Sequence, residues 1–401
     1  MARSRLLILA GAVIASPAAA QTITVTPLVD VRLRHEHVDQ DGIAANADAT
    51  TIRIRSGVQA STGHWSATVE AQGNLAIVGD YYDGLNGTAS RPLIADPQNV
   101  ALYLAQVQYR TPALAITAGR QRIALDDERF VGNAPFRQNA QTYDAVRVEW
   151  IGVPNLKADV TYAWDVRTIW GIDGVGTRQQ GIGGDNVFAN IGYRTPIGTV
   201  TGFAYLVDQD EVLVQGYRLS SQTYGARFAG TRPIGKAKLA YQASYARQSD
   251  YHRNPIDYAA DYYLADIGLD LNGPKLGAGY EVLGASSGTA LTSFQTPLSS
   301  LFKFQGWVDK FLTTPADGIR DVYGSAGYGW KAIGALQAVS LQAVYHRFES
   351  DRAVRHYGNE IDLLASARVG RTTASVRYAD YDADRFGNDT RKLWLQLDWT
   401  I

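Results

Sequence analysis

Apolar and polar residues alternate along many short segments of this chain, and this alternation is the feature that most limits its fold. Near the start of the chain, Val29, Val31 and Leu33 alternate with Arg32 and Arg34. Because successive side chains of a strand point to opposite faces, such a segment forms a strand with one apolar and one charged face. The same pattern recurs at 52–59, 65–72, 146–150, 156–165, 238–245, 360–368 and 393–401.

The connections between these strands alternate in length. Short connections with the Gly and Pro that suit tight turns lie at 62–63, 111–112, 153–154, 195–196, 231–235, 272–274, 331–335 and 370–371. Longer polar segments lie at 37–49, 80–97, 123–142, 167–185, 209–220, 248–257, 285–319, 350–356 and 382–389. Eight short turns and nine long loops predict about 18 strands.

This pattern predicts an all-β fold, a transmembrane antiparallel up-and-down β-barrel with short periplasmic turns and long extracellular loops. Lipid offers no hydrogen-bond partners, so a sheet can cross a membrane only if it closes and leaves no free edge. The 23 tyrosines, which outnumber the 11 phenylalanines, suit a membrane interface, where a ring needs one wet end. A barrel of this size is wide enough for an aqueous lumen.

Residues 1–20 have the pattern of a signal peptide. Arg3 and Arg5 precede a short apolar run, and small residues at 18–20 precede Gln21. We therefore expect residues 21–401 to form a single barrel domain in the bacterial outer membrane. The chain has no cysteine, which excludes disulfides and thiolate metal sites, and its net charge of −1 gives no general affinity for nucleic acid.

The segment 118–146 is too charged for a hydrophobic core, yet it lies between two predicted strands. We expect it to line or plug the mouth of the pore. Arg120 and Arg122 share the parity of Leu114 and Ile116, which suggests a β-bulge near Gly119 that would turn both arginines inward. On the preceding strand, Leu102 and Leu104 also fall on the expected inner face.

Two stretches resemble the alginate-export family of bacterial outer-membrane porins. The first contains GRQR at 119–122, DERFVGN at 127–133, FRQN at 136–139 and QTYDA at 141–145. The second, FQGWVDKFLTTP at 304–315 followed by Gly318 and Asp321, is similar to the large-loop motif of that family. The resemblance covers nearly all of residues 21–401.

The resemblance implies an eighteen-stranded barrel with an arginine-rich constriction that passes an anionic polysaccharide or related acidic sugars. Within the first motif it assigns this role to Arg120, Arg122, Asp127, Arg129 and Arg137. Strand parity adds the inward-facing arginines Arg32, Arg34, Arg53, Arg55 and Arg147. Guanidinium groups stay charged and bind carboxylates bidentately, so a ring of them would attract acidic sugars. The alternative is that these arginines form salt bridges that only brace the wall.

In the second motif, Trp307 and Phe311 beside Lys310 suit either stacking on sugar rings or pinning the loop to the barrel. We expect the pinning role. His35 and His37 form an H-x-H pair without an evident third ligand, and Asp39 and Asp41 form an acidic loop tip. We therefore expect no metal site and no cofactor.

Two other functions stay open at this stage. One is a general or uptake porin for other anionic solutes, because a passive pore has no built-in direction. The other is a barrel enzyme that acts on lipid or surface polymer; the six scattered histidines and the absence of a G-x-S-x-G motif give it no support. We expect a monomer that contacts outer-membrane lipid and lipopolysaccharide, with a periplasmic export partner as a further possibility.

Overall fold

The computed structural model describes residues 22–400, which form 18 strands and two short 3-10 helices. The predicted signal peptide lies outside the described residues. The strands are β1 (Thr24–Gln40), β2 (Ala47–Thr62), β3 (Trp65–Asp80), β4 (Asn99–Arg110), β5 (Leu114–Gln121), β6 (Thr142–Val153), β7 (Leu156–Arg167), β8 (Gly181–Thr195), β9 (Gly198–Val207), β10 (Ser221–Ile234), β11 (Ala237–Asp250), β12 (Ala259–Asp270), β13 (Pro274–Leu283), β14 (Ile319–Ile333), β15 (Leu336–Glu349), β16 (His356–Val369), β17 (Thr372–Ala383) and β18 (Thr390–Thr400). The 3-10 helices are η1 (Gln215–Tyr217) and η2 (Leu301–Lys303). No helix within residues 22–400 is long and apolar enough to cross a membrane.

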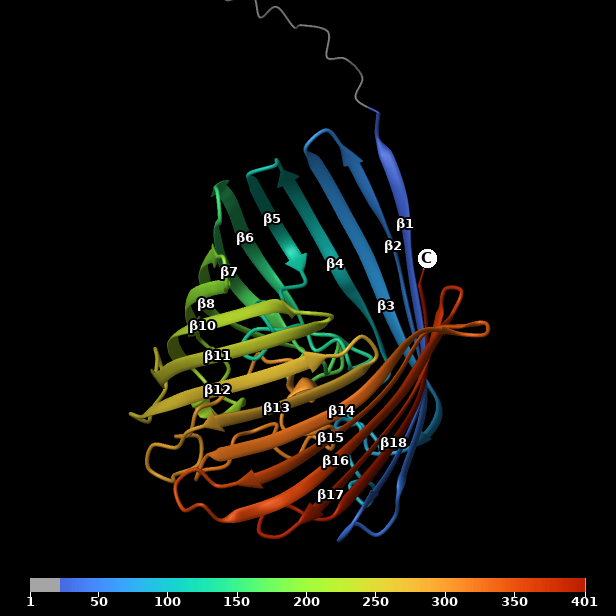
Figure 1. Ribbon diagram of the computed structural model, residues 1–401, viewed down its shortest axis with the longest axis vertical. Helices are drawn as coiled ribbons and strands as arrows, with labels where there is room; N and C mark the ends of the chain where they lie inside the picture. Colours follow the sequence, from blue (N-terminus) through green and yellow to red (C-terminus); the bar gives the residue numbers. More distant parts are fainter. Residues whose placement is uncertain (1–21, 401) are drawn as a thin grey trace, which may run out of the picture.

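Each strand pairs antiparallel with its neighbours in the chain, and β1 also pairs with β18, which closes the sheet into a barrel (Figure 1). In the closing pair Asp30 lies opposite Thr400, so both ends of the barrel chain lie at the end that carries the short turns. The predicted all-β barrel of about 18 strands, with alternating short turns and long loops, is confirmed.

The expected two-faced strands are present. On β1 and β2 the arginines Arg34 and Arg53 are each only 1% exposed and point inward. The neighbouring Leu33 and Ile54 are 36% and 47% exposed on the outer surface. A closed sheet whose outer face is apolar is suited to lipid, because no backbone group is left without a partner.

Two details of strand parity differ from the prediction. Leu102 is exposed on the outer face, because a bulge opposite Glu70 and Ala71 takes up one extra residue and turns Tyr103 and Leu104 inward instead. The bulge expected near Gly119 is absent, since β5 pairs with β4 and β6 without a shift of register. Gly119 does adopt a positive φ of 106°, but the strand continues past it unbroken.

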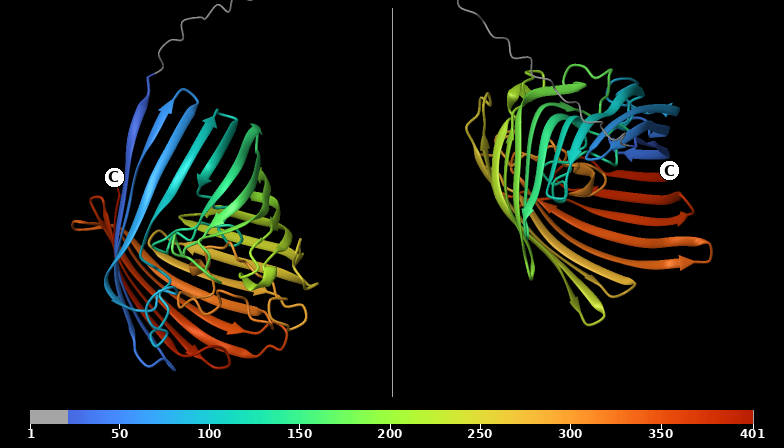
Figure 2. Two further views of the ribbon diagram at one scale, coloured as in Figure 1. Left: turned by 180° about the vertical axis from the view of Figure 1, so that it is seen from behind. Right: turned by 90° about the horizontal axis from the view of Figure 1, so that it is seen from above.

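Two long loops fold into the barrel and fill part of its lumen (Figures 1 and 2). They are the segments 122–141, between β5 and β6, and 284–318, between β13 and β14. Their apolar side chains pack against rings on the inner wall. On the loops these side chains are Ile123, Leu125, Val131, Phe294, Leu298, Val308 and Phe311, and on the wall they are Tyr143, Phe188, Phe203, Tyr205, Tyr262, Phe348, Tyr381 and Trp394. The largest hydrophobic core of the molecule therefore lies inside the barrel and fixes the two loops.

Candidate pore constriction

The two lumen loops are bonded to each other as well as to the wall. The amide of Gly132 donates to the carbonyl of Leu298 at 2.8 Å, next to a β-bridge between Val131 and Leu298. The Ser300 hydroxyl donates to Glu128 at 2.6 Å. The loops therefore form one body, and side chains from both define the passage that remains.

Arg129 holds this body to the wall. Its guanidinium is 1% exposed and lies 2.7 Å from the Glu281 carboxylate on β13. It also donates to the Thr296 hydroxyl at 3.1 Å and lies over the Phe304 ring. Arg129 thus connects both loops to the barrel and does not reach open space.

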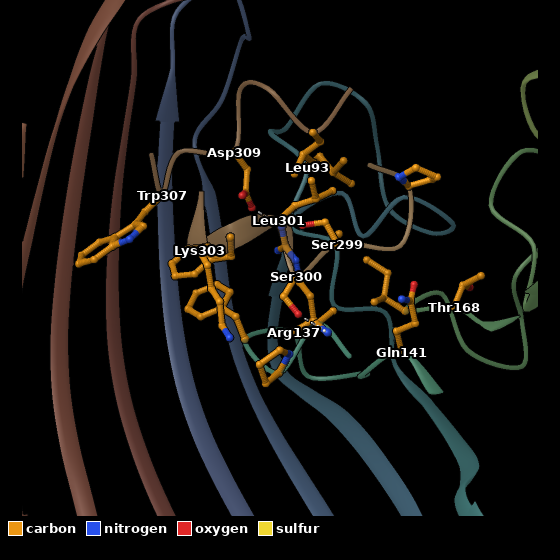
Figure 3. A pocket seen from close by; sticks show the side chains of 18 of the residues that line it. Leu93, Arg137, Gln141, Thr168, Ser299, Ser300, Leu301, Lys303, Trp307 and Asp309 are labelled. Carbon is orange, nitrogen blue, oxygen red and sulfur yellow. Dashed lines mark hydrogen bonds and ion pairs between the residues drawn. The ribbon is translucent and has the colours of Figure 1, made fainter. Parts of the chain in front are cut away.

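The remaining passage contains a cavity of about 890 Å³ between the two loops and the inner wall (Figure 3). Arg137 comes from the first loop, and Lys303, Trp307, Asp309 and Lys310 come from the second. The wall side includes residues on β1, β15, β16, β17 and β18, among them Arg32, Gln342, Leu364, Arg377, Lys392 and Gln396. Residues of β7, β8 and the loops at 81–98, 168–180 and 208–220 also line the cavity. We call this cavity the constriction.

Several cations meet at the constriction, and some of them lack an acidic partner. Arg137 lies 2.5 Å from Asp309, and Arg32 lies 2.7 Å from Asp398. Within residues 22–400, Arg377, Lys392 and Lys310 make no ion pair within 4.0 Å. The acids that act on these cations lie farther than 4.0 Å from them, namely Glu36 and Asp309 for Lys392, Glu360 and Asp389 for Lys310, and Asp398 for Arg377. The constriction therefore holds three cations outside direct ion pairs, at a partly enclosed site where Coulomb interactions are stronger than in bulk water.

Burial and charge shift the pKa values of two loop residues at the constriction. Burial, and to a smaller extent the nearby Lys392 ammonium, lower the pKa of Lys310 to about 8. Burial raises the pKa of the Asp309 carboxyl, while the Arg137 guanidinium opposes the change. Lys310 donates to the Thr390 hydroxyl at 2.6 Å and gives the constriction a charge that titrates near neutral pH.

Aromatic rings lie beside these cations. Phe136 and Phe302, one from each loop, stack with an interplanar angle of 3°. Trp307 lies 6.0 Å beyond Phe302, and the Arg377 guanidinium is within 6 Å of the Phe136 and Trp307 ring centres. The rings shield the cations from bulk water and offer flat apolar surfaces next to them.

Four of the predicted arginines lie on the inner wall, and each contacts polar or aromatic side chains there. Arg34 donates to Gln396 and to the Phe136 carbonyl and lies 3.2 Å from Asp96. Arg53 pairs with Asp30, and Arg147 lies 2.6 Å from Asp159. The fourth, Arg55, donates to Gln72 at 2.6 Å and stacks on Tyr103. These contacts brace the wall and the loops, as the alternative in the sequence analysis described.

The other predicted residues lie in different places. Arg120 stays on the outer face with Ile116, because no bulge turns it, and it lies 2.8 Å from Asp144. Arg122 is exposed, and no ion pair involves it among the described residues. Asp127 accepts from Gln242 at 2.8 Å and lies 3.3 Å from Arg227 on β10. Phe311 is 4% exposed and packs within the interior core, whereas Trp307 lines the constriction.

The sequence analysis missed Arg377 and Lys392. Both follow from strand parity, since Lys392 continues the inward series of Gln396 and Asp398, and Arg377 is the inward neighbour of Val376. Their importance could not be read from parity, because it depends on which acids the lumen loops bring near them.

Comparison with known proteins finds solved structures that share the fold of this chain. No family model matches the sequence, and no curated protein matches it. Similar solved structures include OpdO of Pseudomonas aeruginosa (TM-score 0.69, 15% identity, 94% of this chain and 97% of that chain covered). OccAB4 of Acinetobacter baumannii is also similar (TM-score 0.69, 14% identity, 95% and 99% covered). A third is OpdK of Pseudomonas aeruginosa with vanillate (TM-score 0.69, 11% identity, 94% and 98% covered).

The chain shares with these solved structures the fold of a closed antiparallel β-barrel. The closed barrel, its apolar outer face and these neighbours are consistent with the bacterial outer membrane as the location of the chain. At these identities the likeness concerns the fold, so the solute must be argued from the constriction itself.

Proposed function

We propose that this protein is a passive outer-membrane channel for small organic anions, with carboxylates as the preferred class. The observation that carries this proposal is the group of three cations at the constriction, Arg377, Lys392 and Lys310, that make no ion pair within 4.0 Å among the described residues. A carboxylate that enters from the lumen can meet these charges without displacing a protein carboxylate.

The chemistry of the site suits brief binding. A guanidinium binds a carboxylate bidentately, and ammonium groups add positive charge without fixing the geometry. Passage requires that each contact is weak enough to break, which several adjacent cations allow better than one strong site. The rings of Phe136 and Trp307 offer apolar surface to the carbon skeleton of the solute.

The size of the solute follows from the two lumen loops. They are packed into the interior core and bonded to each other, so the passage beside them suits a compact molecule better than a polymer chain. The structural neighbours likewise favour the uptake-porin alternative over polysaccharide export. OpdK, one of these neighbours, was solved with vanillate, itself a carboxylate. Monomeric acidic sugars remain suitable solutes, whereas export of an alginate-like polymer would require the loops to leave the lumen.

The enzyme alternative has no supporting arrangement. Within residues 22–400 the polar contacts of the histidine side chains are with Asp, Asn, Thr or backbone groups, and none involves a serine hydroxyl. The porins of similar fold are channels. The monomeric state, the contacts with lipopolysaccharide and a periplasmic partner stay predictions.

Channel recordings in planar bilayers with a matched pair of solutes test the proposal. Glucuronate and glucose have the same ring and differ at one carbon, which is a carboxylate in the first. We expect glucuronate to interrupt the current of the wild-type channel and glucose to leave it unchanged. We expect Arg377→Ala to weaken the block by glucuronate. Equal effects of the two sugars would contradict the proposal.

A further inference from the structure

The loop segment 305–308 is hydrogen-bonded to two carboxylates of the inner wall. The Gln305 side chain donates to Glu281 at 2.6 Å, and the Val308 amide donates to Glu360 Oε1 at 2.7 Å. Between them, Gly306 has a φ of 80°, and a Cβ there would lie 2.3 Å from Glu360 Oε2. The residues that line the constriction, Trp307 and Asp309, therefore take their positions from these wall contacts.

Glu360 and Asp362 form a pair on this wall. They are two positions apart on β16, so they share its inner face, and they are 1% and 0% exposed. Three of their four carboxylate oxygens, Glu360 Oε2 and both oxygens of Asp362, accept no hydrogen bond. Unsatisfied buried carboxylate oxygens are costly, and a proton held between two such groups would supply a donor.

The surrounding charges do not balance four ionised carboxylates. Two more buried acids lie close to the pair: Glu281 on β13, which accepts from Gln305 of the same loop segment, and Asp321 on β14, which shares His346 with Asp362. The cations nearest these acids are Arg129 on the first lumen loop, 2.7 Å from Glu281, and His346 on β15, which lies 2.9 Å from Asp321 and 3.7 Å from Asp362. On β17, the Tyr381 phenol side chain stands opposite Glu360. On the lumen loops, Asp309 is paired with Arg137, and Lys310 is a nearby cation with no ion pair of its own within 4.0 Å among the described residues. With Glu281 matched by Arg129, Asp321 by His346 and Asp309 by Arg137, the two carboxylates of the Glu360–Asp362 pair face one further cation, Lys310. A net negative charge remains, which favours one retained proton shared by the two groups.

We propose that the Glu360–Asp362 pair is a pH-sensitive latch that holds the segment 305–309 against the wall. With the shared proton in place, the pair is nearly neutralised and Glu360 accepts the Val308 amide. When the proton leaves, two adjacent buried carboxylates repel each other, and moving the loop away admits water to both. The docked loop favours the protonated form of the pair. The docked position of the loop is therefore stable at low pH and becomes less stable as pH rises. The latch regulates the width of the passage and is independent of which solute passes.

An introduced thiol can report the latch, because the chain has no cysteine of its own. Val308 is 3% exposed against the wall, and Val308→Cys keeps the backbone amide that Glu360 accepts. Leu312→Cys, on the same loop but 42% exposed, measures how pH alone changes thiol reactivity. The rate of modification by a small thiol reagent would be measured for both proteins from about pH 5 to about pH 9.

We expect Val308→Cys to be protected at low pH and to become reactive as pH rises, more steeply than Leu312→Cys. Asp362→Asn in the same background should remove this extra pH dependence, because the pair can no longer hold two charges. Glu360→Gln, which keeps an oxygen for the Val308 amide, is the second variant if Asp362→Asn fails to fold. The latch would be overturned if the protection of Val308→Cys did not change with pH. It would also be overturned if the protection changed with pH to the same extent after Asp362→Asn or Glu360→Gln was added. Because no ion passage is measured, failure here leaves the anion-channel proposal to its own test.

Discussion

Arg137 and Asp309 lie 2.5 Å apart and join the two lumen loops, although they are 172 positions apart in the chain. Their side chains are 11% and 6% exposed, so the pair is largely removed from solvent at the edge of the constriction. Arg137 is the one arginine of the first sequence motif that reaches the constriction, and Asp309 is the one acid among the loop residues that line it. The pair therefore links the two lumen loops to each other, and it also reduces the positive charge that a solute would meet at the constriction.

Replacing Asp309 by Asn should raise anion selectivity. The change removes one negative charge and leaves Arg137 free to face the lumen, so the local potential becomes more positive. The ratio of anion to cation permeability, taken from the zero-current potential in a salt gradient, measures the effect. A fall in this ratio would contradict the assignment of Asp309 to the constriction.

Lys392 and its neighbour Arg391 offer a matched comparison on one strand. Lys392 faces the constriction, whereas Arg391 is 62% exposed on the outer face near Asp380. Lys392→Ala should lower the affinity for a blocking carboxylate several-fold, because one of the unpaired cations is lost. Arg391→Ala should leave block unchanged, and equal effects of the two substitutions would show that general charge loss, and not position, decides the block.

Anion selectivity should depend on pH through Lys310. Burial lowers the pKa of its ammonium group to about 8, so the group is charged below that pH and neutral above it. We therefore expect anion selectivity to fall as pH rises through about 8, and we expect Lys310→Met to lack this change. The measurement is best made in an Asp362→Asn background, where the proposed latch no longer contributes.

Gly306→Ala should loosen the second loop while the barrel stays intact. An added Cβ would meet the Glu360 carboxylate at 2.3 Å, in a backbone conformation that already disfavours Ala. We expect a larger and noisier single-channel conductance and faster cleavage of the loop by protease. Gly370→Ala is the control, because it has the same strain at φ 57° in a short turn but open space around the Cβ. Similar recordings from both variants would show that backbone strain alone explains the result.

Arg129→Ala should affect stability more than selectivity. Removing one partner of a buried ion pair costs about 3–5 kcal/mol, and here it would leave Glu281 buried without its guanidinium. We expect the midpoint of thermal unfolding to fall while the permeability ratio stays close to that of wild type. A large loss of anion selectivity with unchanged stability would place Arg129 in the pathway, as the sequence motif first suggested.

Much of the barrel was predictable because its rules are local. Parity within one strand separates Arg34 from Leu33, and turn chemistry separates short from long connections. Closure then follows from the need to satisfy every backbone group in lipid. Parity failed at two places, Leu102 and the inward bulge expected at Gly119. The second error came from taking the charge of Arg120 as evidence that its side chain points inward, whereas Asp144 on the next strand neutralises it on the outer face.

The constriction was less predictable because its contacts are long-range. Arg129 meets Glu281, 152 positions away, and Arg137 meets Asp309 in another loop. The alternation of apolar and polar residues within a strand does not show which arginines form ion pairs with carboxylates in the folded protein. The residues left unpaired, Arg377 and Lys392, stand in ordinary strand positions, and only the folded loops distinguish them from the arginines that brace the wall.

The most direct test of the central claim is the zero-current potential of the wild-type channel and of an Arg377→Ala, Lys392→Ala double variant in a potassium chloride gradient. The cations outside direct ion pairs at the constriction predict that the wild-type channel prefers chloride and that the double variant loses most of this preference while it still conducts. A wild-type channel that prefers potassium, or a double variant with the wild-type potential, would contradict the claim that these cations select the solute.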